Sequence, residues 1–211
     1  MGQTIAAVLF DMDGVLVDAR EWHYEALNAA LEPFGMPIAR DEHLAVYDGL
    51  PTRKKLEILS KSRGLPKELH EFLNTLKQKH TSGMIGQLCH PTFHHRFTLS
   101  RLQADGYRMA MCSNSVRSTV EKMAKLALIE QYFEFLLSNE DVAKPKPDPE
   151  IYTTAIKEIG ATPERTLIVE DNQHGIAAAE AAGAYVMQVG GPQDVTYKRI
   201  TTRIAEIERL H

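Results

Sequence analysis

The sequence predicts an α/β protein with a doubly wound parallel sheet and a helical domain inserted after its first strand. Three observations lead to this prediction: short unbroken apolar runs, amphipathic stretches between them, and one long segment with helical periodicity. Unbroken apolar character over about six residues is typical of a strand that is covered on both faces. Strands that alternate with helices form right-handed crossover units and a parallel sheet.

Five apolar runs predict the strands, and the first is followed at once by acidic residues. The third run is weaker than the others and leads into a Lys-Pro-Lys-Pro segment. The predicted strands are 5–10, 107–112, 135–138, 166–169 and 185–189.

Three amphipathic stretches predict the helices between these strands. Residues 116–127 and 151–159 each repeat apolar residues at helical spacing. Residues 175–182 are rich in alanine and end before Gly183, which suits a helix that packs closely and stops at a glycine.

The segment from 19 to 85 shows helical periodicity without a convincing strand, and glycine and proline residues punctuate it. We interpret it as a helical cap domain, with 1–18 and 86–211 forming the α/β core. Trp22 and Phe72 are expected in the interior of the cap.

The amino-acid composition limits the classes of function and partner that the protein can have. An apolar fraction of 44% and a charged fraction of 25% are ordinary for a globular protein. A net charge of −4 without a basic tract argues against nucleic acid as a partner. The sequence contains no secretory leader pattern and no apolar window long enough to span a membrane. We therefore expect a cytoplasmic monomer or weak homodimer that binds a small metabolite.

Cys89 and Cys112 do not form a Cys-X-X-Cys pair. Cys112 ends an apolar run and is expected to be a buried thiol, which suits a reducing compartment.

Polar residues follow the predicted strands where each strand ends. In an open parallel sheet, ligands bind beyond the carboxyl ends of the strands, so these side chains should converge. They are Asp11, Asp13, Ser113, Lys144, Glu170 and Asp171.

Four carboxylates in one place repel each other, and a hard cation relieves that repulsion. Oxygen ligands together with a substrate phosphate suit Mg²⁺. A carboxylate such as Asp11 can attack phosphorus, and a second acid two residues later, Asp13, can protonate the leaving oxygen and then activate water. Lys144 and Ser113 are suited to hold the phosphoryl oxygens.

Four motifs in the expected order resemble those of the haloacid dehalogenase superfamily. They extend over nearly the whole chain, and the cap after the first motif is similar to that of the subfamily containing β-phosphoglucomutase and phosphoglycolate phosphatase. The resemblance implies a Rossmann-type core. The motifs are Phe10-Asp11-Met12-Asp13-Gly14, Cys112-Ser113-Asn114-Ser115, Ala143-Lys144-Pro145-Lys146-Pro147 and Val169-Glu170-Asp171-Asn172.

The resemblance implies a role for each site residue. Asp11 would be the nucleophile and Asp13 the general acid and base. Asp11, Asp171 and the main-chain carbonyl of Asp13 would bind Mg²⁺, and Glu170 would bind it directly or through water. Ser113 and Lys144 would hold the phosphoryl group. Because haloacid dehalogenases themselves generally lack the second aspartate, Asp13 favours a phosphoester substrate.

Further residues are candidates for substrate binding. The related mutase has a cap arginine after a glycine, and the matching segment here places Thr52 at that position after Gly49, with Arg53 beside it. This favours hydrolysis, with a sugar phosphate as the expected substrate, over a mutase reaction. The other candidates are His23 at the cap entrance and Asn114 and Arg117 after the second core strand.

Three alternatives stay open. A β-phosphoglucomutase-like mutase would share the phosphorylated Asp11 but return the phosphoryl group to the sugar. A signalling receiver module also combines acidic residues, a serine or threonine and a lysine on a parallel sheet, although its phosphorylated aspartate follows the third strand. His90, His94 and His95 could form a second metal site or lie at a surface or hinge.

Overall fold

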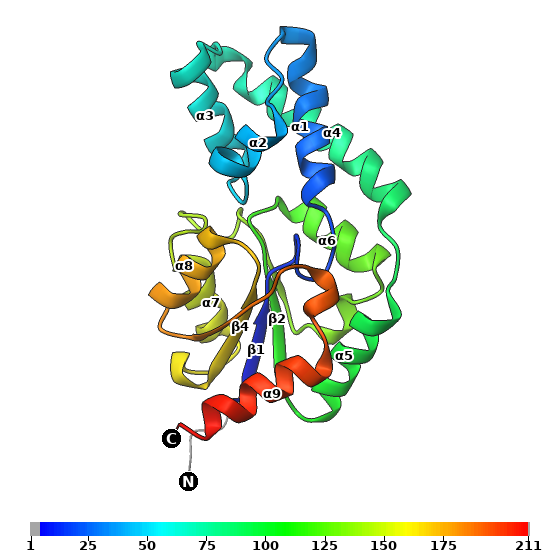
Figure 1. Cartoon of the computed structure of the whole chain (residues 1–211), viewed down its shortest axis with the longest axis vertical. Coiled ribbons are helices and arrows are strands. Elements are labelled where there is room, and N and C mark those ends of the chain that lie inside the picture. Colours follow the sequence, from blue (N-terminus) through cyan, green and yellow to red (C-terminus); the bar gives the residue numbers. More distant parts are fainter. Residues whose placement is uncertain (1–4, 211) are drawn as a thin grey trace. The chain divides into compact units, whose positions relative to one another are not determined.

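The computed structural model describes residues 5–210 and divides into two compact units (Figure 1). The core unit comprises the chain up to Asp18 and from His90 onward, and the cap unit comprises Ala19–Cys89. The expected boundary after residue 85 falls inside helix α4 (His70–Leu88), so the cap unit extends to the end of that helix.

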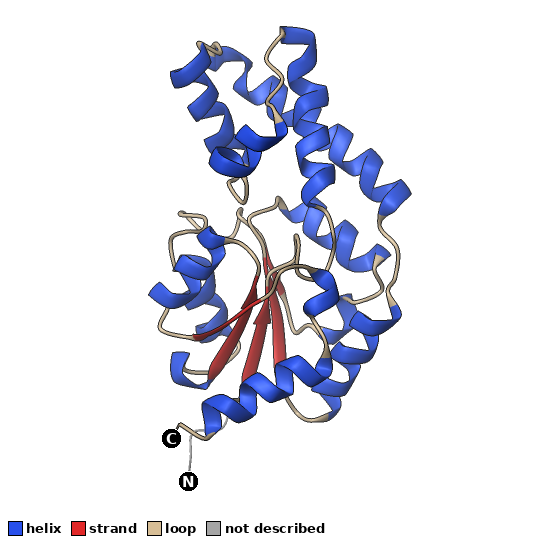
Figure 2. Ribbon diagram, in the orientation of Figure 1, coloured by secondary structure: helices blue, strands red, loops and turns tan. Residues whose placement is uncertain are grey.

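The core unit contains a five-stranded parallel sheet, which confirms the predicted fold class (Figure 2). Its strand order is β3-β2-β1-β4-β5. Because β1 lies in the middle and the chain continues to either side of it, the order reverses beside β1, where open α/β sheets bind ligands. The strands are β1 (Ala7–Phe10), β2 (Arg108–Cys112), β3 (Leu136–Leu137), β4 (Thr166–Glu170) and β5 (Tyr185–Gln188).

The central strand is covered on both faces, as its unbroken apolar sequence predicts. Ala7 and Leu9 pack into a cluster with residues of α7 and α8, and the alternating Val8 and Phe10 are fully buried as well. The covering helices are α5 (Phe93–Ala104), α6 (Arg117–Leu126), α7 (Glu150–Glu158), α8 (Gln173–Ala181) and α9 (Tyr197–Glu208).

Helices α5 and α9 are absent from the sequence-based predictions. Helix α9 buries Ile200, Ile204 and Ile207, a spacing that marks one helical face. Helix α5 buries His95 and Thr98 beside Leu99, so polar residues interrupt its apolar pattern.

The cap unit consists of helices around its own apolar centre. Leu27, Leu31, Leu56, Leu59 and Leu73 are all buried in one cluster. The elements are α1 (Arg20–Leu31), α2 (Arg40–Glu42), a π-helical turn (His43–Tyr47), α3 (Thr52–Arg63) and α4. Short 3-10 turns lie in both units, at Glu32–Phe34, Lys67–Leu69, Glu130–Tyr132, Pro163–Arg165 and Pro192–Asp194.

The prediction that Phe72 lies in the interior of the cap is wrong. Its side chain is 55% exposed, and its ring meets Phe34 edge-on at 6.3 Å between centroids. Trp22 is partly buried. No helix within residues 5–210 is both long and apolar enough to cross a membrane.

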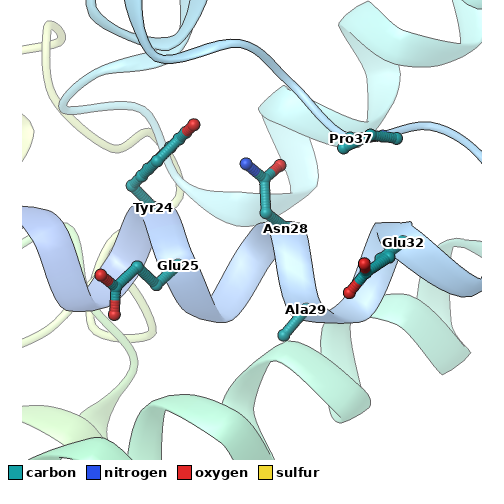
Figure 3. Close-up of a pocket in the computed structure, with 6 residues that line it drawn as sticks. All are labelled: Tyr24, Glu25, Asn28, Ala29, Glu32 and Pro37. Carbon is teal, nitrogen blue, oxygen red and sulfur yellow. The ribbon is translucent and has the colours of Figure 1, made fainter.

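A pocket of about 370 Å³ lies along α1 of the cap unit (Figure 3). Its polar groups hold the neighbouring chain segment: Asn28 bonds both the N–H and the C=O of Ile38, and the Tyr24 hydroxyl donates to the same carbonyl. The lining residues are Tyr24, Glu25, Asn28, Ala29, Glu32 and Pro37.

Candidate active site

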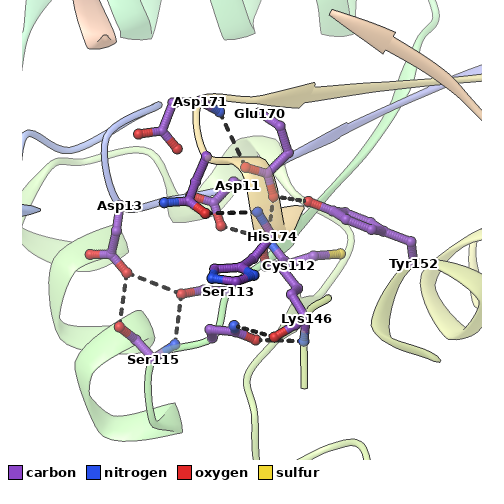
Figure 4. Close-up of polar contacts among 12 residues, drawn as sticks. Asp11, Asp13, Cys112, Ser113, Ser115, Lys146, Tyr152, Glu170, Asp171 and His174 are labelled. Carbon is purple, nitrogen blue, oxygen red and sulfur yellow. Dashed lines mark hydrogen bonds and ion pairs between the residues drawn. The ribbon is translucent and has the colours of Figure 1, made fainter. Parts of the chain in front are cut away.

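The carboxyl ends of β1, β2 and β4 bring five of the six predicted polar residues together (Figure 4): Asp11, Asp13, Ser113, Glu170 and Asp171. Strand pairing continues one residue past β1, where the Asp11 N–H donates to Val169 O at 3.0 Å. The Ser113 N–H likewise donates to Leu137 O at 2.9 Å. These backbone bonds fix where Asp11 and Ser113 leave the sheet.

The lysine beside Asp11 is Lys146, and the prediction of Lys144 for this place is corrected. The Lys146 side chain is 3% exposed, and its Nζ donates to Asp11 Oδ1 at 2.6 Å and Glu170 Oε1 at 2.7 Å. A third bond goes to Cys112 O at 2.8 Å. The ammonium therefore uses all three of its donors in the site.

Lys144 points to solvent, with 73% of its side chain exposed and its Nζ 3.7 Å from Asp148. The backbone explains the difference. Glu150 accepts from the N–H groups of Ala143 and Lys144, which ties that segment to the start of α7.

Lys146, two residues after Lys144, is held by the Asn114 side chain. Its backbone N–H donates to Asn114 Oδ1 at 3.0 Å, and its C=O accepts from Asn114 Nδ2 at 3.2 Å. Asn114 was predicted to contact substrate. In the structure its side-chain amide fixes the backbone of Lys146.

Asp13 lies between two serines. Ser113 Oγ donates to Asp13 Oδ2 at 3.2 Å and Ser115 Oγ donates to the same atom at 2.8 Å. The Ser115 N–H donates in turn to Ser113 Oγ at 3.0 Å. The structure thus brings Ser113 to the site as predicted and adds Ser115. Two serines that flank Asn114 in one motif were a signal for this pair.

Asp11, Glu170 and Asp171 form a group that could hold a metal ion. Each offers an oxygen, and these atoms lie within 4.8 Å of one another. Both carboxylate oxygens of Asp171 are buried. Lys146 bonds one oxygen each of Asp11 and Glu170, so their second oxygens can face a cation. An oxygen-only donor set of this kind fits Mg²⁺.

Gly175 on α8 is required for this arrangement. A Cβ atom at this position would lie 1.9 Å from Glu170 Oε1. The missing side chain lets the first turn of α8 approach the Glu170 carboxylate closely.

Burial and the neighbouring charges shift the pKa values of Asp11 and Lys146. Burial raises the pKa of Asp11 well above its usual range, and the carboxylates of Glu170, Asp171 and Asp13 add to the rise, while Lys146 opposes it. Burial by itself would lower the pKa of Lys146, but Asp11 and Glu170 outweigh it and raise that pKa, so the ammonium stays charged. A divalent cation beside these carboxylates would oppose the rise in the pKa of Asp11 and favour its ionised form.

Tyr152 is a buried group of the site that the sequence analysis missed. Its hydroxyl donates to Glu170 Oε1 at 2.5 Å. Burial raises the pKa of Tyr152 well above its usual value, with Glu170 and Asp11 adding to the rise, so the hydroxyl keeps its proton.

Arg117, a candidate for anion binding, is engaged elsewhere. Its guanidinium pairs with Asp141 and lies 3.7 Å from Glu121. The backbone N–H of Arg117 donates to Glu140 Oε2 at 2.7 Å. The side chain is 45% exposed. These contacts give no support to a role in the site.

The histidine cluster predicted as a possible second metal site ties α5 to the turn at Pro192. His95 Nε2 lies 2.9 Å and His94 Nε2 3.2 Å from Pro192 O, and His95 Nδ1 lies 2.7 Å from Thr92 Oγ1. His90 is exposed. In the described part of the chain, the group whose oxygens could hold a metal ion consists of Asp11, Glu170 and Asp171. The contacts of His94 and His95 with Pro192 therefore favour a structural role for these histidines.

Within the cap unit, the substrate candidates differ in burial. Arg53 is exposed, whereas Thr52, which begins α3, and Gly49 are partly buried. His23 Nδ1 lies 3.1 Å from Nζ of the buried Lys77.

A second buried lysine of the cap unit, Lys55, lies 3.3 Å from His43 Nε2. Neither lysine was singled out from the sequence, because a lysine on a helix is ordinarily a solvated surface residue.

Comparison with known proteins assigns the family. The profile of haloacid dehalogenase-like hydrolases matches residues 8–189. A phosphorylated carbohydrates phosphatase from Thermotoga maritima is 30% identical over 178 residues, which cover 84% of this chain and 81% of that protein. A β-phosphoglucomutase from Bacillus subtilis is 26% identical over 226 residues, covering 97% and 93%.

The fold agrees with this assignment. The crystal structure of a β-phosphoglucomutase from Clostridium difficile matches with a TM-score of 0.83 at 19% identity, over 96% of this chain and 98% of that one. The chain therefore belongs to the haloacid dehalogenase-like hydrolase family.

Proposed function

We propose that this hydrolase is a Mg²⁺-dependent phosphatase that acts on a small phosphorylated metabolite, with a sugar phosphate as the substrate class. One observation carries the proposal: Lys146 bridges Asp11 and Glu170, and Asp11, Glu170 and Asp171 bring their oxygens within 4.8 Å of one another. The similarity to a phosphatase of phosphorylated carbohydrates supports the substrate class.

Each acid has a separate task. A carboxylate oxygen of Asp11 attacks phosphorus and the bond to the leaving oxygen breaks, while Asp13 gives that oxygen a proton. Asp13 then takes a proton from a water molecule that attacks the same phosphorus, which releases phosphate and restores Asp11. The hydrogen bonds from Ser113 and Ser115 hold Asp13 in place for both transfers.

Lys146 opposes the rise in the pKa of Asp11 and orients its carboxylate for attack. Asp11, Glu170, Asp171 and the main-chain carbonyl of Asp13 would hold Mg²⁺. When bound, the ion supplies positive charge that offsets the charge on the phosphoryl oxygens.

The proposal is tested by phosphate release from a panel of sugar phosphates, nucleotides and phosphoglycolate, with Mg²⁺ or with a chelator. Turnover should require Mg²⁺ and should fall at least ~10⁴-fold in Asp11→Asn, as for other covalent nucleophiles. Normal turnover by Asp11→Asn would refute the assignment.

The similarity to β-phosphoglucomutase over most of both chains makes a mutase the second candidate. It would share the acyl phosphate at Asp11 but return the phosphoryl group to the sugar. Product analysis with a hexose 1-phosphate separates the two: free phosphate supports the phosphatase, and an isomeric sugar phosphate supports the mutase.

A further inference from the structure

One hydrogen-bond donor to Glu170 comes from helix α7, outside the four motifs. Tyr152 is fully buried, and its hydroxyl donates to Glu170 Oε1 at 2.5 Å (Figure 4). Its ring lies under the Lys146 ammonium, with Nζ 4.8 Å from the ring centroid. A single side chain therefore contacts both members of the ion pair.

These contacts divide the two oxygens of Glu170 between different tasks. Oε1 accepts from Lys146 Nζ at 2.7 Å and from Tyr152 at 2.5 Å, so its two lone pairs are directed into the core unit. Within the described part of the chain, Oε2 accepts one longer hydrogen bond, from the Asp171 N–H at 3.2 Å. Oε2 is therefore the oxygen presented towards Asp171.

The ring of Tyr152 cannot easily move. It packs in the apolar cluster of the sheet with residues such as Leu9, Ala110 and Ile168. A donor held by close packing restricts the rotation of the carboxylate that it bonds. A hydrogen-bond partner of a metal ligand influences how tightly the site binds the metal ion.

We propose that Tyr152 is a positioning residue that holds Glu170 Oε1 inward, so that Oε2 is oriented for a divalent cation beside Asp11 and Asp171. The inference rests on the proposed Mg²⁺ site. It assigns to α7 a part in cation binding that the family motifs in this sequence do not include.

The test is Mg²⁺ affinity measured by calorimetry without substrate, for the wild-type protein and Tyr152→Phe. Phenylalanine keeps the ring and its packing and removes only the hydroxyl. We expect affinity to fall about tenfold or more, as for other outer partners of metal ligands. The matched control is Tyr107→Phe. Tyr107 directly precedes the first residue of β2, at the end of the strand away from the site, so removing its hydroxyl should leave the Mg²⁺ affinity unchanged.

A double-mutant cycle with Glu170→Gln separates positioning from a general loss of structure. If Tyr152 acts through Glu170, adding Tyr152→Phe to Glu170→Gln should lower the affinity little further. Equal losses in both backgrounds, or wild-type affinity in Tyr152→Phe, would overturn the inference.

The phosphatase assay distinguishes this failure from failure of the proposed function. A wild-type protein that binds Mg²⁺ but releases no phosphate would refute the function alone, because the affinity comparison would still decide the role of Tyr152. A wild-type protein that binds no Mg²⁺ would overturn both.

Discussion

Lys146 is the residue whose removal tests the geometry of the site most sharply. Its ammonium lies 2.6 Å from Asp11 and 2.7 Å from Glu170, and its side chain is 3% exposed. Replacing it with methionine keeps most of the volume and leaves the two carboxylates facing each other without a cation. Breaking a buried pair in this way costs about 3–5 kcal/mol of folding free energy.

The matched control is Lys144→Met, two residues away. That side chain is 73% exposed and its carboxylate partner is 3.7 Å distant, so the substitution should leave stability nearly unchanged. Equilibrium urea unfolding of both variants, with and without Mg²⁺, measures the difference. Mg²⁺ should recover part of the stability lost in Lys146→Met, because it replaces positive charge beside the same carboxylates.

Turnover should also fall in Lys146→Met and not in Lys144→Met. Loss of one preorganised charged group in an active site costs about 10²–10³ in rate, so Lys146→Met should be slow and Lys144→Met should match the wild type. A Lys146→Met protein with wild-type stability and turnover, paired with an inactive Lys144→Met protein, would show that the wrong lysine has been assigned to the site.

Three other predictions follow from the structure. Asp13→Asn should lower turnover about 10²–10⁴-fold in the phosphate-release assay, and wild-type turnover would contradict its role as acid and base. Gly175→Ala should weaken Mg²⁺ binding about tenfold or more in calorimetry, since its Cβ would lie 1.9 Å from Glu170 Oε1, whereas Gly83→Ala, whose Cβ meets nothing within 4 Å, should bind normally; equal affinities would refute the close approach. Burial lowers the pKa of His95 to about 4, so its contribution to folding stability should be complete above about pH 6.5 and be lost as the pH falls towards 4, because the unfolded state then binds the proton first. Urea unfolding between pH 7 and 5 should show a smaller decline for His95→Gln than for the wild type, and identical declines would contradict this.

The strands were predictable because burial on both faces leaves a simple signal. Residues 7–10 are apolar without interruption, and all four are fully buried in the centre of the sheet. Helix α9 is equally predictable, because Ile200, Ile204 and Ile207 repeat at helical spacing. In α5 the signal is weaker, since buried His95 and Thr98 break the apolar face.

The acidic residues were predictable for a different reason: each directly follows a strand, so the sheet alone brings them together. Lys146 was not, because Lys-Pro-Lys-Pro-Asp-Pro contains two overlapping Lys-Pro-X-Pro strings. Only the contacts of Asn114 and Glu150 with the loop backbone decide which lysine turns inward. Tyr152 was hidden for a similar reason, since an aromatic residue on a helix ordinarily indicates packing and not a hydrogen bond to an acid.

The central claim is that Asp11 carries the phosphoryl group during turnover. The most direct measurement is acid quenching of the Asp13→Asn protein during turnover of p-nitrophenyl phosphate with Mg²⁺, followed by mass spectrometry of its peptides. The p-nitrophenolate group leaves without a proton from Asp13, so loss of Asp13 should slow hydrolysis of the acyl phosphate more than its formation, and we predict one phosphoryl group on the peptide at Asp11. Steady phosphate release by the wild-type protein with no phosphorylated Asp11 in either protein would contradict the account.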